Sequence, residues 1–113
     1  RHEMTLFPRP YASIASGQKT IELRLYDEKR QSIQIGDQIR FTNTEDASQT
    51  TLCEVVGLHV FKDFRELYEK LPLLQCGYTP EDVDNAHPDD MLTYYSKEKQ
   101  AQYGVVGIEL KRI

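Results

Sequence analysis

A chain of 113 residues is long enough to bury one hydrophobic core and too short for two, so we expect a single domain over residues 1–113. With 39% hydrophobic and 28% charged residues, the composition is that of a globular domain and excludes an intrinsically disordered chain. The formal net charge of −4 argues against a protein that coats nucleic acid through bulk attraction.

The sequence predicts neither a membrane span nor secretion. Its apolar runs are far shorter than the roughly 20 residues that a membrane-spanning helix needs. The first residues lack the apolar core of a secretory signal, and we therefore expect a cytoplasmic location. Cys53 and Cys76 have no histidines near them at metal-ligand spacing, so we expect reduced, structural thiols, no metal site and no cofactor.

The chain begins with a predicted strand, helix and strand. Residues 3–7 alternate like a short strand, and the prolines that follow lead into a helix over residues 10–16. Gly17 is suited to end that helix, because glycine adopts the left-handed conformation without steric cost. From residue 19 to 26 apolar and polar residues alternate, which predicts a strand whose Ile21, Leu23 and Leu25 face the core of a barrel.

The remaining elements complete a βαβββ order followed by helices and a last strand. The predicted segments are a charged loop over residues 27–32, a turn at Gly36, a strand over 38–43, a polar hairpin turn over 44–49, a long strand over 50–61 with a bulge at Gly57, a helix over 64–71 capped by Asp63, a short helix after Thr79, a helix over about 91–102 and a strand over 105–110. This order favours an α+β architecture in which the last strand returns to close a bent sheet or barrel.

The segment Gly17-Gln18-Lys19-Thr20-Ile21-Glu22-Leu23-Arg24 resembles the signature of the ASCH family, Gly-x-Lys-x-x-Glu-x-Arg. The Gly36-Asp37 turn and the segment 103–108 are also similar to the family's pattern, so the resemblance spans nearly the whole chain. It implies a PUA-like bent β-barrel of about five to six mostly antiparallel strands with flanking helices. It also implies a cleft between the barrel and the helices.

The resemblance implies two kinds of function. The first is a module that binds RNA or a nucleotide-like small molecule in the cleft. The alternative is a small hydrolase that acts on a modified nucleoside, as an acetylcytidine amidohydrolase does, or on RNA, as a ribonuclease does. Because one fold hosts unrelated functions, the residues of the site must decide between them.

Four residues of the signature segment are the central candidates for ligand binding: Lys19, Thr20, Glu22 and Arg24. An arginine offers a planar fork for a phosphate or base edge, and a carboxylate accepts from an exocyclic amine. The structural alternative is a Lys–Glu–Arg ion-pair cluster that only fixes the strand. Further candidates at the rim, which combine cations with stacking aromatic rings, are Lys29, Arg30, Tyr95 and Tyr103.

Lys19 and Glu22 are also the candidates for catalysis. The amidohydrolase relatives resemble this chain in having a lysine at the position of Lys19, but they have a nucleophilic threonine where Glu22 stands. A carboxylate that attacked an amide would form an anhydride, so the same mechanism does not carry over. We therefore favour a binding module over an enzyme.

A third hypothesis concerns the segment of residues 79–90, which holds five acids and neither lysine nor arginine. Such a segment favours a contact with a basic protein partner.

Overall fold

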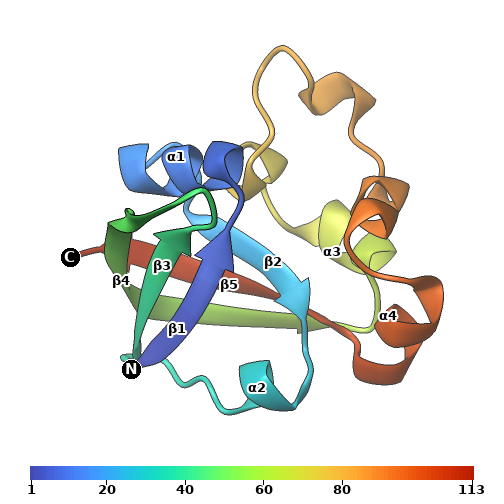
Figure 1. Cartoon of the computed structure of the whole chain (residues 1–113). Helices are drawn as coiled ribbons and strands as arrows, with labels where there is room; N and C mark the ends of the chain where they lie inside the picture. Colours follow the sequence, from blue (N-terminus) through green and yellow to red (C-terminus); the bar gives the residue numbers. More distant parts are fainter.

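A single five-stranded sheet curls into a half barrel in the computed structural model, which describes residues 1–113 (Figure 1). Its order is β1-β3-β4-β5-β2; β1 and β3 are parallel, and the other three neighbouring pairs are antiparallel. The strands are β1 (His2–Leu6), β2 (Ile21–Leu25), β3 (Gln38–Asn43), β4 (Asp46–Phe61) and β5 (Val105–Arg112). The predicted α+β class and bent, mostly antiparallel sheet are confirmed.

Four α-helices and three 3₁₀ helices connect the strands. They are α1 (Pro8–Ser16), α2 (Glu28–Gln31), α3 (Phe64–Lys70), α4 (Lys97–Tyr103), η1 (Leu73–Cys76), η2 (Val83–Asn85) and η3 (Pro88–Thr93). In Figure 1, α1 lies on one side of β2, and α3 and α4 lie together on the other. The predicted end of α1 at Gly17 and the Asp63 cap of α3 are both confirmed. No helix combines the length and the apolar character needed to cross a membrane.

The long strand β4 holds the sheet together and bends it. Its first half pairs with β3 and its second half with β5. The pairing with β5 shifts register between Val55 and Gly57, which confirms the predicted bulge. Because a bulge adds a residue to one strand, it increases the local twist and helps the sheet to curl.

The sheet has one hydrophobic core on each of its two faces. One fills the curl and includes Ile14 of α1 together with Phe41 and Val55. The other lies between β2 and α3, where Leu23 packs with Phe64. Ile21 and Leu25 share this second core, so the predicted apolar face of β2 is confirmed, but it covers the helices and not the inside of the barrel.

Several predicted boundaries were wrong for local reasons. Residues 27–32 are not a loop, because the Asp27 carboxylate accepts from Arg30 N and starts the one-turn helix α2. The helix expected after Thr79 is only the 3₁₀ helix η2. The helix expected over residues 91–102 is divided into η3 and α4, since Ser96 caps a new helix. The strand expected over 19–26 is limited to residues 21–25 and lies at the edge of the sheet.

Candidate functional site

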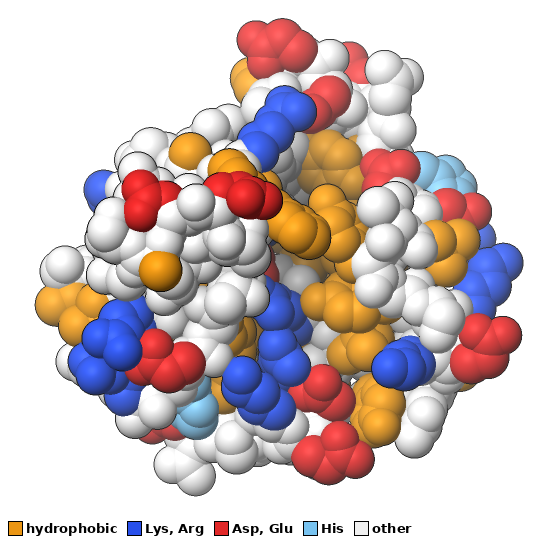
Figure 2. Space-filling model, in the orientation of Figure 1, with side chains coloured by type: hydrophobic (Ala, Val, Ile, Leu, Met, Phe, Trp, Pro, Cys, Tyr) orange, Lys and Arg blue, Asp and Glu red, His pale blue; other side chains and the backbone are white.

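A cleft of about 680 Å³ separates the curled sheet from the arm that contains η1, η2 and η3. One wall is formed by the end of β1 and the first two turns of α1, the floor by β2, and the other wall by the arm and Tyr68 of α3. Figure 2 shows a hollow lined by hydrophobic side chains, with Lys and Arg side chains gathered at one end. The hollow lies between the curled sheet and the helical arm.

The floor of the cleft carries a buried carboxylate between two cations. Glu22 is 3% exposed. Its neighbours Ile21 and Leu23 point to the other face of β2, into the second core, whereas Glu22 faces the cleft. Lys19 Nζ lies 2.8 Å from Glu22 Oε1, and Arg24 Nε lies 2.6 Å from Glu22 Oε2. Burial raises the pKa of Glu22, but the charges of Lys19 and Arg24 outweigh burial, and the pKa lies below its usual value.

Arg24 makes a second contact that fixes its side chain. Its Nη2 donates to the carbonyl oxygen of Thr5 in β1 at 2.9 Å. Burial lowers the pKa of Arg24, but Glu22, Tyr95 and Asp27 together raise it above its usual value, so the guanidinium stays charged. The ion-pair cluster left open by the sequence thus exists, and it lies where a ligand in the cleft would meet its polar atoms.

Tyrosines and an aspartate form the opposite wall. Tyr68 Oη and Tyr78 Oη are 2.7 Å apart, and Tyr78 Oη donates to Asp90 Oδ2 at 2.6 Å. Burial raises the pKa of Tyr68 to about 12, and burial together with the bond to Asp90 raises the pKa of Tyr78. These hydroxyls therefore remain neutral hydrogen-bonding groups near neutral pH.

Two further tyrosines differ in how they are held. The ring of Tyr95 stacks on Phe64 with centroids 6.2 Å apart and is anchored in the second core. Tyr94 is 56% exposed and lines the rim of the cleft. Tyr94 is thus open to solvent, whereas the orientation of the Tyr95 ring is fixed by its packing on Phe64.

The structure brings only part of the predicted site together. Lys19, Glu22, Arg24 and Tyr95 line the cleft. Thr20 does not line it, and its Oγ1 donates to Gln75 Oε1 at 3.3 Å. The three other candidates lie outside the cleft: Lys29 donates to Glu3 O, Arg30 pairs with Asp27, and Tyr103 packs against the second core.

Sequence reasoning missed the residues of the arm wall. Tyr68 packs against the second core and Asp90 lies in the first turn of η3, and both side chains also line the cleft. Tyr78 lies in an irregular segment without any pattern. Only the fold places these three residues opposite Glu22.

Comparisons with known proteins agree with this geometry. The ASCH domain family model matches residues 4–113. The crystal structure of the hypothetical protein PH0355 is 33% identical, with a TM-score of 0.79, and the alignment covers 98% of this chain and 97% of that one. The solution structure of protein PF0455 from Pyrococcus furiosus is 32% identical, with a TM-score of 0.72 and coverages of 99% and 96%.

A more distant structure shows the same fold. The ASCH protein from Zymomonas mobilis is 14% identical, with a TM-score of 0.64, and the alignment covers 96% of this chain and 65% of that one. At this identity the likeness concerns the fold alone. No protein with a curated description matches the sequence.

Proposed function

This chain belongs to the ASCH domain family, and on that premise we propose that it binds single-stranded RNA by holding one nucleotide in the cleft. The observation that carries the proposal is the placement of the Lys19–Glu22–Arg24 cluster on the floor of a cleft whose far wall is aromatic. A base needs both kinds of surface, because its edge is polar and its face stacks.

The size and walls of the cleft support a base as the occupant. A volume of about 680 Å³ lies within the usual range of small-ligand sites. The exposed ring of Tyr94 offers a face on which a base can stack. Unpaired bases of single-stranded RNA can reach such a site, whereas bases in a duplex cannot.

The charges of the cleft favour a base over a phosphate as its occupant. Its lining cations are Arg9, Lys19 and Arg24, and its lining acids are Glu22, Asp82 and Asp90, so the two signs balance. Strong attraction of an anion is not expected at such a site. The carboxylates and the N–H groups instead provide acceptors and donors for the edge of a base.

Binding is favoured over hydrolysis by the state of the signature residues. Both carboxylate oxygens of Glu22 already accept from cations, which makes the group a poor nucleophile. Thr20 is the hydroxyl beside the signature lysine, but it bonds with Gln75 and does not line the cleft. The candidate catalytic pair Lys19 and Glu22 therefore acts in our proposal as a recognition element.

The proposal is tested by fluorescence anisotropy with labelled single-stranded RNA hexamers, using the wild type and Tyr94→Ala. Loss of one stacked base removes about 1–3 kcal/mol, so Tyr94→Ala should bind the hexamer at least several-fold more weakly. Ile35→Ala is the control, because Ile35 is 66% exposed and lies outside the cleft.

Absence of saturable binding, or equal binding by the wild type and Tyr94→Ala, contradicts the proposal. The acidic segment of residues 79–90 would then become the better explanation, with a basic protein as its partner. That segment contributes Asp82 and Asp90 to the cleft wall, so a basic peptide could be titrated in the same assay.

A further inference from the structure

The hydroxyl groups on the arm wall of the cleft form a chain of hydrogen bonds whose direction is fixed. Tyr78 Oη lies 2.6 Å from Asp90 Oδ2 and 2.7 Å from Tyr68 Oη. An ionised carboxylate can only accept hydrogen bonds, so Tyr78 donates its one hydroxyl hydrogen to Asp90. The bond between the two tyrosines therefore has Tyr68 as its donor and Tyr78 as its acceptor.

The arm wall consequently faces the cleft with acceptors. Burial raises the pKa of Tyr68 to about 12 and also raises the pKa of Tyr78, so both hydroxyls keep their hydrogens near neutral pH. Both hydrogens are used within the chain of bonds, and the backbone N–H of His87 holds the Asp90 carboxylate from behind at 3.2 Å. What the wall can offer to a ligand is the lone pairs of Tyr68 Oη and the carboxylate of Asp90.

The floor of the cleft has the opposite character. Both carboxylate oxygens of Glu22 already accept, one from Lys19 and the other from Arg24. An ammonium has three N–H donors and a guanidinium has five, and the bonds to Glu22 and to Thr5 O do not use all of them. The floor can therefore donate hydrogen bonds to a ligand, while the wall across the cleft can accept them.

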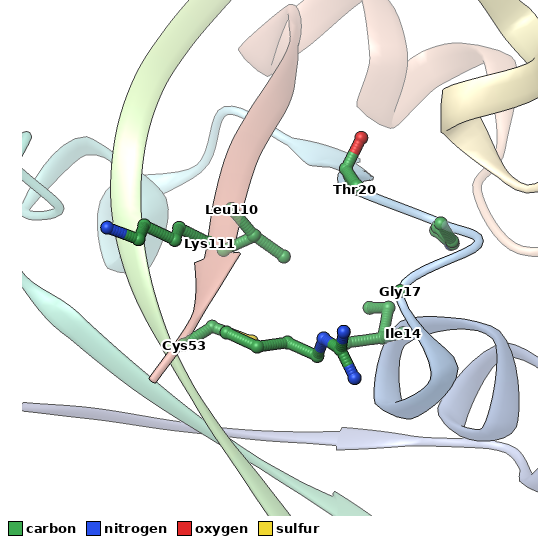
Figure 3. Close-up of a pocket in the computed structure, with 8 residues that line it drawn as sticks. Ile14, Gly17, Thr20, Cys53, Leu110 and Lys111 are labelled. Carbon is green, nitrogen blue, oxygen red and sulfur yellow. The ribbon is translucent and has the colours of Figure 1, made fainter.

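The second hollow of the molecule lacks this pairing. It has a volume of about 250 Å³ and lies between the turn after α1 and the end of β5 (Figure 3). Figure 3 shows the Lys111 side chain directed away from it, and Arg112 Nη1 already donates to Ala15 O at 2.6 Å. No carboxylate lines this hollow. Donors that face acceptors are thus a property of the main cleft.

We propose that the cleft selects bases with an exocyclic amino group, which are adenine, cytosine and guanine, over uracil. The inference rests on the proposed function and makes the ligand more specific. An amino group can donate to the wall while a ring nitrogen or carbonyl oxygen of the same base accepts from the floor. Uracil has a carbonyl oxygen on each side of its N3–H, so one carbonyl would face the acceptors of the wall without a donor.

Tyr78 sets this preference as a positioning residue. Because it accepts from Tyr68, it keeps the Tyr68 hydroxyl from donating into the cleft. In Tyr78→Phe the Tyr68 hydroxyl loses that acceptor and becomes free to donate to a carbonyl oxygen of the base. The quantity that reports on Tyr78 is therefore the ratio of two affinities, which a purely structural role would leave unchanged.

The test measures fluorescence anisotropy of labelled single-stranded hexamers on the full chain. Cytidine and uridine hexamers form one matched pair, and adenosine and inosine hexamers form the other. In each pair the second base has a carbonyl oxygen where the first has its amino group. The variant is Tyr78→Phe, and the control is Tyr103→Phe, which removes a tyrosine hydroxyl outside the cleft.

We expect the wild type to bind the amino member of each pair about tenfold more tightly than the carbonyl member. In Tyr78→Phe this ratio should fall close to one, because binding of the carbonyl member improves. Tyr103→Phe should keep the wild-type ratio. If Tyr78→Phe impairs folding, Asp90→Asn decides: a carboxamide can donate to Tyr78, which lets the chain reverse, so the ratio should fall there as well.

Equal binding of the amino and carbonyl members by the wild type overturns the inference. So does an unchanged ratio in the folded variant, or an equal fall in Tyr103→Phe. In these cases hexamer binding that is weakened by Tyr94→Ala leaves the proposed function intact. If no hexamer binds saturably, or if Tyr94→Ala binds like the wild type, the proposed function itself is wrong and the inference fails with it.

Discussion

Arg24 joins the two edges of the curled sheet: its Nη2 donates to Thr5 O at 2.9 Å, although β2 and β1 are not paired with each other. Lys29 adds a second link to the same edge, from its Nζ to Glu3 O at 2.9 Å. In Figure 1 these two strands lie at the open side of the half barrel. Side chains, and not a backbone ladder, therefore hold the open side together.

The first prediction is that Arg24→Ala lowers the free energy of unfolding by about 3–5 kcal/mol. The substitution removes the bond to Thr5 and leaves the buried Glu22 carboxylate with Lys19 as its only cationic partner. Urea denaturation measures the effect. Lys29→Ala is the control, because its exposed side chain should cost less than about 1 kcal/mol.

A double-mutant cycle separates the ion pair from the bond to Thr5. Glu22→Gln should lower the unfolding free energy much less in the Arg24→Ala background than in the wild type, because Glu22 has by then already lost one of its two cationic partners. Equal costs in the two backgrounds would contradict the coupling. Since Arg24 supports the fold, a loss of RNA binding in Arg24→Ala alone would not locate the ligand.

The second prediction concerns acid stability. The pKa of Glu22 is below the usual 4.5, because Lys19 and Arg24 outweigh burial, which acts in the opposite direction. A carboxyl whose pKa is lowered by folding stabilises the fold above its unfolded pKa, and this contribution is lost as the pH falls. The difference in unfolding free energy between the wild type and Glu22→Gln should therefore shrink from about pH 7 to about pH 3.

Glu45→Gln is the control for that titration, because Glu45 is exposed and makes no side-chain ion pair. Its unfolding free energy should follow the wild type at every pH. A constant or growing difference between the wild type and Glu22→Gln on acidification would show that Glu22 is not held as a charged group by its neighbours.

The sequence predicts the sheet better than it predicts the cleft. Local patterns sufficed for β2 and for the end of α1, because alternation and a left-handed glycine act over a few residues. They failed for residues 79–103, where η2, η3 and α4 depend on caps and packing along an irregular arm. The helix expected after Thr79 and the first part of the helix expected over residues 91–102 form only short 3₁₀ helices, because too little apolar surface is buried there to support longer helices.

For the site, the signature strand predicted the floor but not the arm wall. Glu22 and Arg24 are two residues apart, so alternation places them on the same face of β2. Lys19 precedes the strand, and the turn after α1 brings its ammonium to Glu22. Tyr78 and Asp90 are twelve residues apart and meet through a bond that only the tertiary structure creates. Lys29 lies near the signature in sequence, yet its side chain is used to hold β1 and does not line the cleft.

The third prediction compares two glycines with left-handed backbones. Gly17→Ala and Gly36→Ala each place a Cβ where φ is positive, 86° and 97° respectively, which costs about 1–2 kcal/mol. A Cβ at Gly36 meets nothing within 4 Å, whereas a Cβ at Gly17 would meet the Arg112 guanidinium at 2.9 Å. Thermal unfolding should therefore show the larger loss for Gly17→Ala.

Equal stability losses in the two variants would mean that the Arg112 guanidinium moves aside freely. The close approach of Arg112 to Gly17 would then contribute nothing to stability.

The last prediction is that the wild type does not hydrolyse N4-acetylcytidine. Hydrolysis of that amide would need a free nucleophile, whereas the two carboxylate oxygens of Glu22 are bound by Lys19 and Arg24. Glu22→Thr should not produce fast hydrolysis either. That change leaves two cations without their carboxylate, which destabilises the fold, and the new hydroxyl would still need a base to become a nucleophile.

Mass spectrometry of N4-acetylcytidine incubated with the wild type, Glu22→Thr and Lys19→Ala decides the matter. We expect unchanged substrate in all three reactions, and a shift of cleft amide signals if the wild type binds the nucleoside without turnover. Lys97→Ala serves as the control, since it removes an exposed lysine outside the cleft. Release of acetate by the wild type and by Lys97→Ala, but not by Lys19→Ala, would show that the Lys19–Glu22 pair is catalytic, and the binding-module proposal would be wrong.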